Sequence, residues 1–244
     1  HYVLKKGSFP APISLMRDRL SDDLRDSLDA ADIIHIHWPH GFVDLGELHD
    51  LAGSTPVIWT LHDMAAFTAV CHYSLGCAGF TTNCSSCPAL RRPFQHLAPA
   101  TLHKKKENID SVSHLRLVSP SRWLADEAER SSVLGGRKVE VIPNPISFPT
   151  GASEPVQVLR RKWGISDKER VFLVVAASTD DPLKGVAQTL ETFESVHAEH
   201  SNSRLLVAGR TARRTAPKGV SLLGTVSGGD LNDLYSIADN LIVN

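Results

Sequence analysis

The sequence predicts an α/β protein made of two doubly wound units, each built on a parallel β-sheet. Three observations carry this prediction. Short β-branched apolar runs alternate with segments of helical spacing, a proline-rich stretch interrupts the alternation, and the alternation then starts again. A chain of 244 residues that is 42% hydrophobic and 22% charged is long enough to bury one large core or two modest ones.

The first half of the chain contains four expected strands and three expected helices. Apolar, β-branched runs predict strands over 31–38, 56–63, 115–121 and 138–146. Apolar residues at helical spacing predict helices over 46–53, 102–113 and 122–131. The first of these helices is expected to end at Gly53, and Ser121 is placed to cap the third.

A proline-rich stretch separates the two halves. Pro143, Pro145, Pro149 and Pro155 surround the segment TGASE, a composition typical of a linker. We therefore expect an N-terminal domain over 1–146 and a C-terminal domain over 147–244. In the C-terminal domain the same patterns predict helices over 185–200 and 230–239 and strands over 170–178, 204–209, 220–226 and 241–243.

The charge balance argues against a protein that binds polyanions through its overall charge. The formal net charge of −1 gives the chain no general attraction to nucleic acid or to an anionic membrane. No run approaches the roughly 18 apolar residues that span a bilayer, and the start lacks the regions of a signal peptide. We expect a soluble chain. Because it starts without methionine and stops inside an apolar run, we also expect both ends to be missing.

Polar side chains follow the expected strand 56–63. Ligands of open α/β sheets bind beyond the carboxyl ends of the strands, so His62 and Asp63 are candidate cleft residues. The alternative is that His62 is a core histidine and Asp63 caps the next turn. His35 and His37 alternate with isoleucines on the preceding strand and are expected to form a polar face near the same crevice.

A cysteine-rich loop over 71–87 follows. Cys71, Cys77, Cys84 and Cys87 have the spacing x5, x6 and x2, and the closing Cys-x2-Cys pair is a common zinc half-site. We expect structural zinc, because the loop has little apolar core and metal binding would supply its folding energy. Two disulfides and four free cysteines are the alternatives.

In the second half, Lys184 and Gly185 stand between an expected strand and a long helix. The start of a helix attracts phosphate through its backbone N–H groups, and a lysine adds a full charge there. A solvated turn is the alternative. Gly209 follows another strand, where the missing side chain allows close backbone approach to a ligand.

Several segments, in order and spacing, resemble glycosyltransferase family 4, more narrowly its bacterial colanic acid and exopolysaccharide branch. They are VIWTLHDMAAFTAVCHYSLGC with CSSCPAL, LVSPSRWLADEAERS, VEVIPNPI, LKG, LLVAG, and LLGTV with DLNDLYSIAD. The similarity covers nearly the whole chain from about Ala31 onward. It implies a GT-B architecture of two facing Rossmann-like domains, both incomplete here. It also implies retaining transfer of a sugar from a UDP- or GDP-linked donor, without an essential metal at the donor phosphates.

The resemblance also implies roles for particular residues. His62 matches the cleft histidine near the transferred sugar, with His37 and Asp63 beside it on the acceptor side. Lys184 matches the lysine that neutralises the donor diphosphate, and Gly185 opens the helix behind that diphosphate. Thr225 and Val226 match the loop that touches the nucleotide base, and Gly209 is assigned to the donor side as well.

The chain departs from the family pattern near the diphosphate. Many members have an arginine about five residues before the lysine, where this chain has Thr179 and Asp180, and Asp181 adds a further negative charge. The paired glutamates that bind the donor sugar and the first glycine-rich loop fall outside the 244 residues. We therefore expect little transferase activity from these residues alone.

The implied acceptor is a glycan or a lipid-linked glycan, and the implied location is the cytoplasm, at the inner face of the membrane. Lys104, Lys105 and Lys106 form a short basic run that could touch an anionic surface, although a solvated helix face is the favoured interpretation. Two alternative functions are a noncatalytic nucleotide-sugar or glycan-binding relative and a GT-B-like sugar-nucleotide epimerase.

Overall fold

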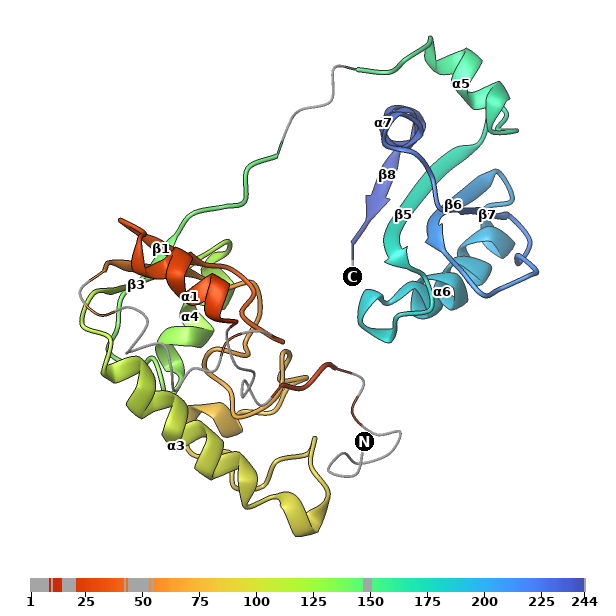
Figure 1. Ribbon diagram of the computed structural model, residues 1–244. Helices are drawn as coiled ribbons and strands as arrows, with labels where there is room; N and C mark the ends of the chain where they lie inside the picture. The colour runs from red at the N-terminus through yellow and green to blue at the C-terminus, as the bar shows by residue number, and fades with distance from the viewer. Residues whose placement is uncertain are drawn as a thin grey trace. The chain divides into compact units, whose positions relative to one another are not determined.

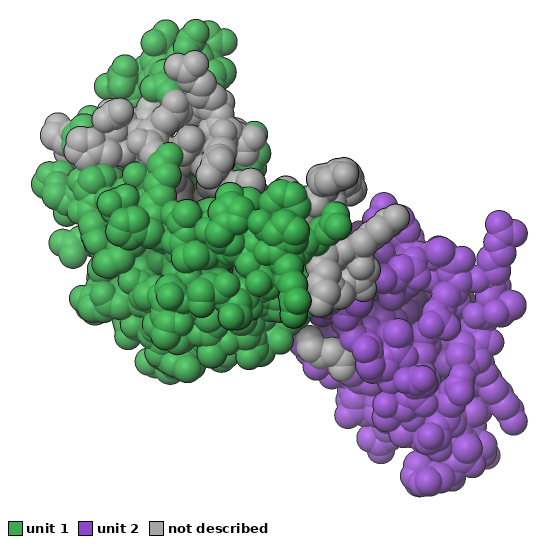
Figure 2. All heavy atoms as spheres, turned by 90° about the horizontal axis from the view of Figure 1, so that it is seen from below, with its two compact units in different colours: residues 1–145 green, residues 146–244 purple. Residues whose placement is uncertain are grey.

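The computed structural model describes residues 9, 11–14, 21–41, 43, 53, 55–146 and 151–243. The chain divides into two compact units, His1–Pro145 and Ile146–Asn244, which we call the N-terminal and the C-terminal unit (Figure 2). Within the described residues each unit contains one four-stranded sheet, and every strand pair is parallel. The predicted α/β class with two parallel sheets is confirmed.

The sheet of the N-terminal unit has the strand order β1-β2-β3-β4, of which β1 and β3 are labelled in Figure 1. Its strands are β1 (Ile34–Ile36), β2 (Val57–Thr60), β3 (Leu115–Ser119) and β4 (Val139–Val141). Its helices are α1 (Asp22–Asp29), α3 (Leu97–Asp110) and α4 (Arg122–Arg130), and its short 3-10 helices are η2 (Gly79–Thr81) and η3 (Arg92–Phe94).

Helix α4 shows how the local sequence sets an element. The Ser121 hydroxyl accepts a hydrogen bond from the backbone N–H of Leu124 at 3.3 Å, so the predicted N-cap is confirmed. Leu124, Ala125 and Ala128 form the buried face, which packs on β3 and β4.

The core of the N-terminal unit extends well past the end of β2. Trp59 on the strand and Leu61, Met64 and Phe67 after it are all fully buried. The segment 61–70 is therefore an internal loop: apart from His62, its residues are buried. A loop packed in this way holds the side chains that it carries in one place.

The C-terminal unit has the strand order β7-β6-β5-β8. Its strands are β5 (Arg170–Ser178), β6 (Ser203–Arg210), β7 (Val220–Gly224) and β8 (Asn240–Ile242). Its helices are α5 (Val156–Lys162), α6 (Val186–Glu199) and α7 (Gly228–Ile237), and the 3-10 helix η4 (Pro182–Lys184) precedes α6.

Strand β5 is buried on both faces, as a central parallel strand should be. Val171 and Leu173 pack with residues of α5 and α7, whereas Val174 and Ala176 pack with residues of α6. Helices therefore cover both faces of this sheet, which is the doubly wound arrangement.

The predicted elements correspond closely to the observed ones, with shorter strands in the N-terminal unit. Two helices, α1 and α5, were not predicted, and α5 begins directly after Pro155, within the stretch interpreted as linker. The helix expected over 46–53 lies outside the described residues apart from Gly53.

Candidate functional site

Two histidines meet at the carboxyl edge of the N-terminal sheet. His37 directly follows β1, and His62 comes two residues after β2, which pairs in parallel with β1. The Nδ1 atom of His37 and the Nε2 atom of His62 are 2.9 Å apart, and both side chains are exposed. One ring must donate and the other accept, so each imidazole fixes the tautomer of its partner.

His35 belongs to the same group. Its ring centroid lies 4.1 Å from that of His37, and its Nε2 atom is 2.9 Å from the hydroxyl oxygen of Thr60. Desolvation lowers the pKa of His35, and the neighbouring imidazoles of His37 and His62 lower it further. The group therefore opposes protonation of His35, and the expected polar face at this crevice is present.

Asp63 lies behind this exposed group. One carboxylate oxygen accepts the backbone N–H of Ala65 at 2.8 Å, and the other is 2.7 Å from Nδ1 of His72. The side chains of Asp63 and His72 are both buried. The turn-capping alternative for Asp63 is confirmed, and its carboxylate is held by protein groups.

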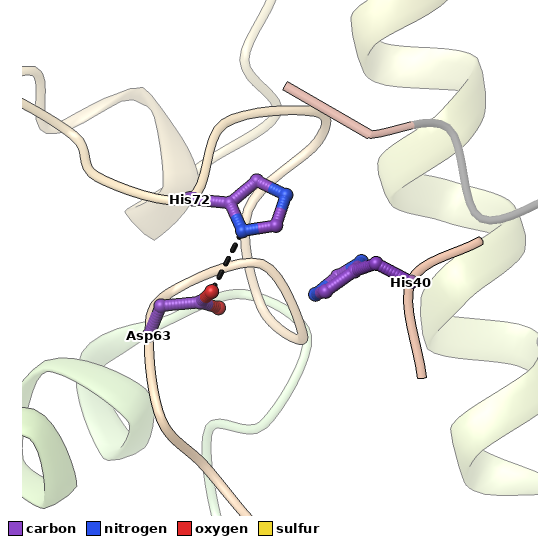
Figure 3. Close-up of side chains that lie close together, drawn as sticks. All are labelled: His40, Asp63 and His72. Carbon is purple, nitrogen blue, oxygen red and sulfur yellow. Dashed lines mark hydrogen bonds and ion pairs between the residues drawn. The ribbon is translucent and has the colours of Figure 1, made fainter. Parts of the chain in front are cut away.

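His72 and its neighbour His40 were not singled out from the sequence. The backbone N–H of Met64 donates to the carbonyl of His72 at 3.0 Å, so the loop returns to its start and places His72 beside Asp63. The ring of His40 lies 4.2 Å from that of His72 (Figure 3). No periodic pattern marks such a loop closure, so local sequence carries no signal for it.

Lys105 is also placed differently from the interpretation of the run 104–106 as a solvated face. It is buried, and its ammonium group donates to the carbonyls of Ala65 and Thr68 at 2.6 and 2.8 Å. Lys104 and Lys106 are exposed, and Lys106 pairs with Asp110. The three lysines therefore do not form one basic surface, because the middle one braces the loop after β2.

The four cysteines are free thiols that line one cavity of about 260 Å³. Burial raises the pKa of Cys71 and Cys87, and raises the pKa of Cys84 to about 11. Among the described residues, the side chains whose ligand atoms lie within 4.8 Å of one another and could hold a metal ion are His40, Asp63 and His72. This group contains no cysteine. The alternative of two disulfides is not observed, and zinc at the cysteines stays a prediction.

In the C-terminal unit, Lys184 and Gly185 connect η4 to α6. Gly185 has φ +60°, in the left-handed region, and Lys184 is exposed. Both residues lie after β5, on the carboxyl side of the strand, where the sequence places the start of the 14-residue helix α6. The first N–H groups of an α-helix have no acceptor within the helix itself, and this end of the helix dipole favours a negative charge.

The two aspartates before Lys184 both bind backbone groups. Asp180 accepts the N–H of Ala212 at 2.8 Å, and Asp181 accepts the N–H of Leu183 at 2.9 Å. Asp181 thereby caps η4, and Asp180 ties the loop after β5 to the loop after β6. These bonds give both carboxylates a structural role in shaping the turn.

Of the remaining donor-side candidates, Thr225 and Val226 follow β7, whereas Gly209, expected after a strand, lies within β6. Gly209 has φ +144°, and a Cβ atom there would lie 1.9 Å from the carbonyl oxygen of Ala176. The neighbouring strand alone therefore requires this glycine. Thr225 is exposed just after β7, whereas Val226 is half-buried against the core beneath α5 and α7.

Comparison with known proteins adds named relatives. No protein family profile matches the chain. It is 28% identical over 105 residues to the putative colanic acid biosynthesis glycosyl transferase WcaC of Escherichia coli strain K12, covering 39% of this chain and 24% of that protein. It is 24% identical over 227 residues to alpha-monoglucosyldiacylglycerol synthase of Acholeplasma laidlawii, covering 85% of this chain and 51% of the synthase.

A solved structure shares the fold. Anabaena HepE, crystallised in complex with UDP and glucose, superposes with a TM-score of 0.54 at 14% identity, over 90% of this chain and 54% of HepE. The chain thus spans about half the length of the synthase and of HepE. At this identity the likeness establishes the α/β fold with two parallel sheets. Among the described residues no helix is long and apolar enough to cross a bilayer.

Proposed function

We propose that this protein is a retaining GT-B glycosyltransferase that moves a sugar from a UDP- or GDP-linked donor to a glycan or lipid-linked acceptor. The observation that carries the proposal is the 2.9 Å contact between His37 and His62 at the carboxyl edge of a parallel sheet. Support comes from two relatives named as glycosyl-transferring enzymes and from the shared fold with a structure that binds UDP and glucose.

The N-terminal unit supplies the acceptor side in this proposal. His62 is exposed, and its contact with His37 prevents free rotation of its ring. A fixed imidazole can donate or accept one hydrogen bond at a sugar hydroxyl, which positions that hydroxyl for reaction. Asp63 supports His62 indirectly. Its carboxylate accepts the N–H of Ala65 and so shapes the turn that carries His62.

The C-terminal unit supplies the donor side. Lys184 places a cationic ammonium group just before α6, and the backbone donors of the helix start lie behind it. As the bond to the sugar breaks, negative charge develops on the departing diphosphate, and a positioned cation stabilises it. Gly185, Gly209, Thr225 and Val226 contribute backbone and small side chains around the nucleotide.

The noncatalytic alternative rested on Asp180 and Asp181, which add negative charge near the diphosphate. Their carboxylates accept backbone N–H groups of Ala212 and Leu183, and hydrogen bonds of this kind neutralise part of their effect on an anion. Both aspartates therefore have a role in the turn that is compatible with a working phosphate site, which favours the catalytic proposal.

Donor binding tests the proposal. Lys184→Ala should weaken the binding of UDP-glucose or a GDP-sugar by about tenfold to hundredfold, in line with about 1–3 kcal/mol for a charged hydrogen bond. Lys168→Ala is the matched control, because Lys168 is an exposed lysine that precedes β5, at the opposite edge of the same sheet. Isothermal titration measures both constants. Equal affinity of the Lys184 variant and the wild type would contradict the donor assignment.

The acceptor and the cysteine loop are part of the same proposal. One relative is named for colanic acid biosynthesis and the other as a synthase of alpha-monoglucosyldiacylglycerol, and both names support a glycan or lipid-linked acceptor. We propose that the reaction takes place at the inner face of the membrane. For the cysteines we keep structural zinc, with Cys71, Cys77, Cys84 and Cys87 as ligands after local rearrangement around their shared cavity.

A further inference from the structure

We propose that His40, Asp63 and His72 form a zinc site in the N-terminal unit that uses none of the four cysteines as a ligand. The inference does not depend on the proposed function. Each residue offers one ligand atom, and these atoms all lie within 4.8 Å of one another. Figure 3 shows that the three side chains converge from separate segments of the chain.

The donor set suits zinc. Two imidazole nitrogens and one carboxylate oxygen match the three-ligand sites that hold Zn²⁺ and leave a fourth position open. Asp63 and His72 are buried, at 7% and 2% exposure, and His40 is half-buried. Burial keeps competing water away from the ligand atoms. Because these side chains have already lost most of their hydration, a divalent cation would gain direct coordination by them.

The surroundings already orient two of the ligands. Nδ1 of His40 contacts the hydroxyl of Ser14 at 3.2 Å, and Figure 3 shows the other ring nitrogen directed toward Asp63. The Oδ1 atom of Asp63 accepts from the N–H of Ala65, which directs Oδ2 to the cluster. Metal-binding histidines and carboxylates are characteristically held in this way by a second partner.

A small cavity lies beside two of the three residues, and His72 is not among the residues that line it. His40 and Asp63 both line a cavity of about 10 Å³, close to the volume that one water molecule requires. His37 and His62 line the same cavity. A bound metal would therefore lie near the exposed histidine pair and would fasten the turn that carries His62.

The required rearrangement is small. Metal–ligand bonds of about 2.0–2.1 Å place tetrahedral ligand atoms roughly 3.3 Å apart, so a spread of at most 4.8 Å closes by at most about 1.5 Å. Nδ1 of His72, now 2.7 Å from Asp63, can bind a metal in the tautomer that carries its proton on Nε2. A neutral His72 that carries its proton on Nδ1 releases that proton to solvent and takes one up on Nε2, so the number of protons on the ring is unchanged, and no redox step is involved.

Metal titration tests the site. The chelator-stripped chain is dialysed against Zn²⁺, and bound metal is counted for the wild type, His40→Gln and His103→Gln. His40→Gln should weaken one class of zinc binding by about tenfold or more, as loss of a ligand does. His103→Gln should bind as the wild type does, because His103 is an exposed histidine on α3 that faces Glu107.

Cobalt distinguishes the two sites. With Cys84 and Cys87 changed to serine, Co²⁺ should still give visible bands of nitrogen and oxygen coordination, without the near-ultraviolet charge-transfer band of a thiolate. If the double cysteine variant does not fold, the same bands are sought as the difference between wild type and His40→Gln. Zinc binding that is unchanged in His40→Gln, or cobalt bands that come from thiolate alone, would overturn the proposal.

Discussion

The ammonium group of Lys105 lies beneath the loop that carries Asp63 and His72. It donates to the carbonyls of Ala65 and Thr68, two backbone acceptors that no water can reach from outside the core. Desolvation lowers the pKa of Lys105 from 10.5 to about 8, against the opposing attraction of Cys71 and Asp63. The charge is costly, and the two hydrogen bonds explain why the residue is nevertheless buried.

Replacement of Lys105 should lower the free energy of unfolding. In Lys105→Met the two carbonyls lose their hydrogen-bond donor, while the cost of burying the ammonium charge is removed. We expect a net loss of about 1–3 kcal/mol in the free energy of unfolding. Lys104→Met should change stability by less than about 0.5 kcal/mol, because Lys104 is exposed. Urea unfolding of the two variants measures the difference, and equal midpoints would contradict the bracing role.

The stability difference between wild type and Lys105→Met should depend on pH. Between pH 8 and 10.5 the unfolded state still binds the proton that the folded state has released, so wild-type stability rises relative to the variant. The expected gain is about 1.5 kcal/mol between pH 8 and 9.5. A neutral amine keeps two N–H groups for the two carbonyls. A difference that is flat over this range would show that Lys105 has an ordinary pKa.

Residues of the candidate site differ in how far the sequence reveals them. His37, His62 and Lys184 follow strands or open a helix, so their positions follow from the element pattern. His40, His72 and Lys105 do not. His72 meets Asp63 through the closure of an internal loop, His40 packs against His72, and Lys105 donates to carbonyls of that loop. That closure depends on packing across the core, which no short-range pattern encodes.

At the scale of elements, the close contact of β5 and β6 depends on one glycine. A Cβ atom at Gly209 would lie 1.9 Å from the carbonyl oxygen of Ala176, far below any real contact. Because the clash is with backbone, it can be relieved only by separating the two central strands of the sheet.

Gly209→Ala should therefore destabilise the C-terminal unit by roughly 2–4 kcal/mol, since steric strain adds to a φ of +144° that alanine avoids. Gly229→Ala, in the first turn of α7 where a Cβ atom meets nothing within 4 Å, should be neutral or stabilising. Thermal unfolding compares the two. Equal melting temperatures would mean that the strands are not as close as described.

The order of strands and helices was predictable, because both units alternate short β-branched runs with helical spacing. The ends of the strands were less predictable. The expected strand 56–63 ends at Thr60, because the chain then turns into the buried loop. Helix α5 was not predicted, because Pro155 directly before it belongs to a stretch with the composition of a linker. A proline is nevertheless also suited to the start of a helix.

At the scale of the whole molecule, the proposed function divides one reaction between two units. We propose that the C-terminal unit binds the donor through Lys184 and the start of α6, and that the N-terminal unit positions the acceptor through His62. Each unit has its own core and its own parallel sheet. A substitution in one unit can therefore change the chemical step without changing the binding that the other provides.

Sugar transfer by the full-length protein with His62→Ala tests this division most directly, because little activity is expected from these 244 residues alone. Transfer from the nucleotide sugar and donor affinity are measured on the same preparations, with the exposed His114→Ala as the control. We expect kcat to fall by about tenfold to a thousandfold in His62→Ala, the range for loss of one positioned group, with an unchanged donor Kd. An unaltered kcat, or loss of donor binding in place of turnover, would contradict the account.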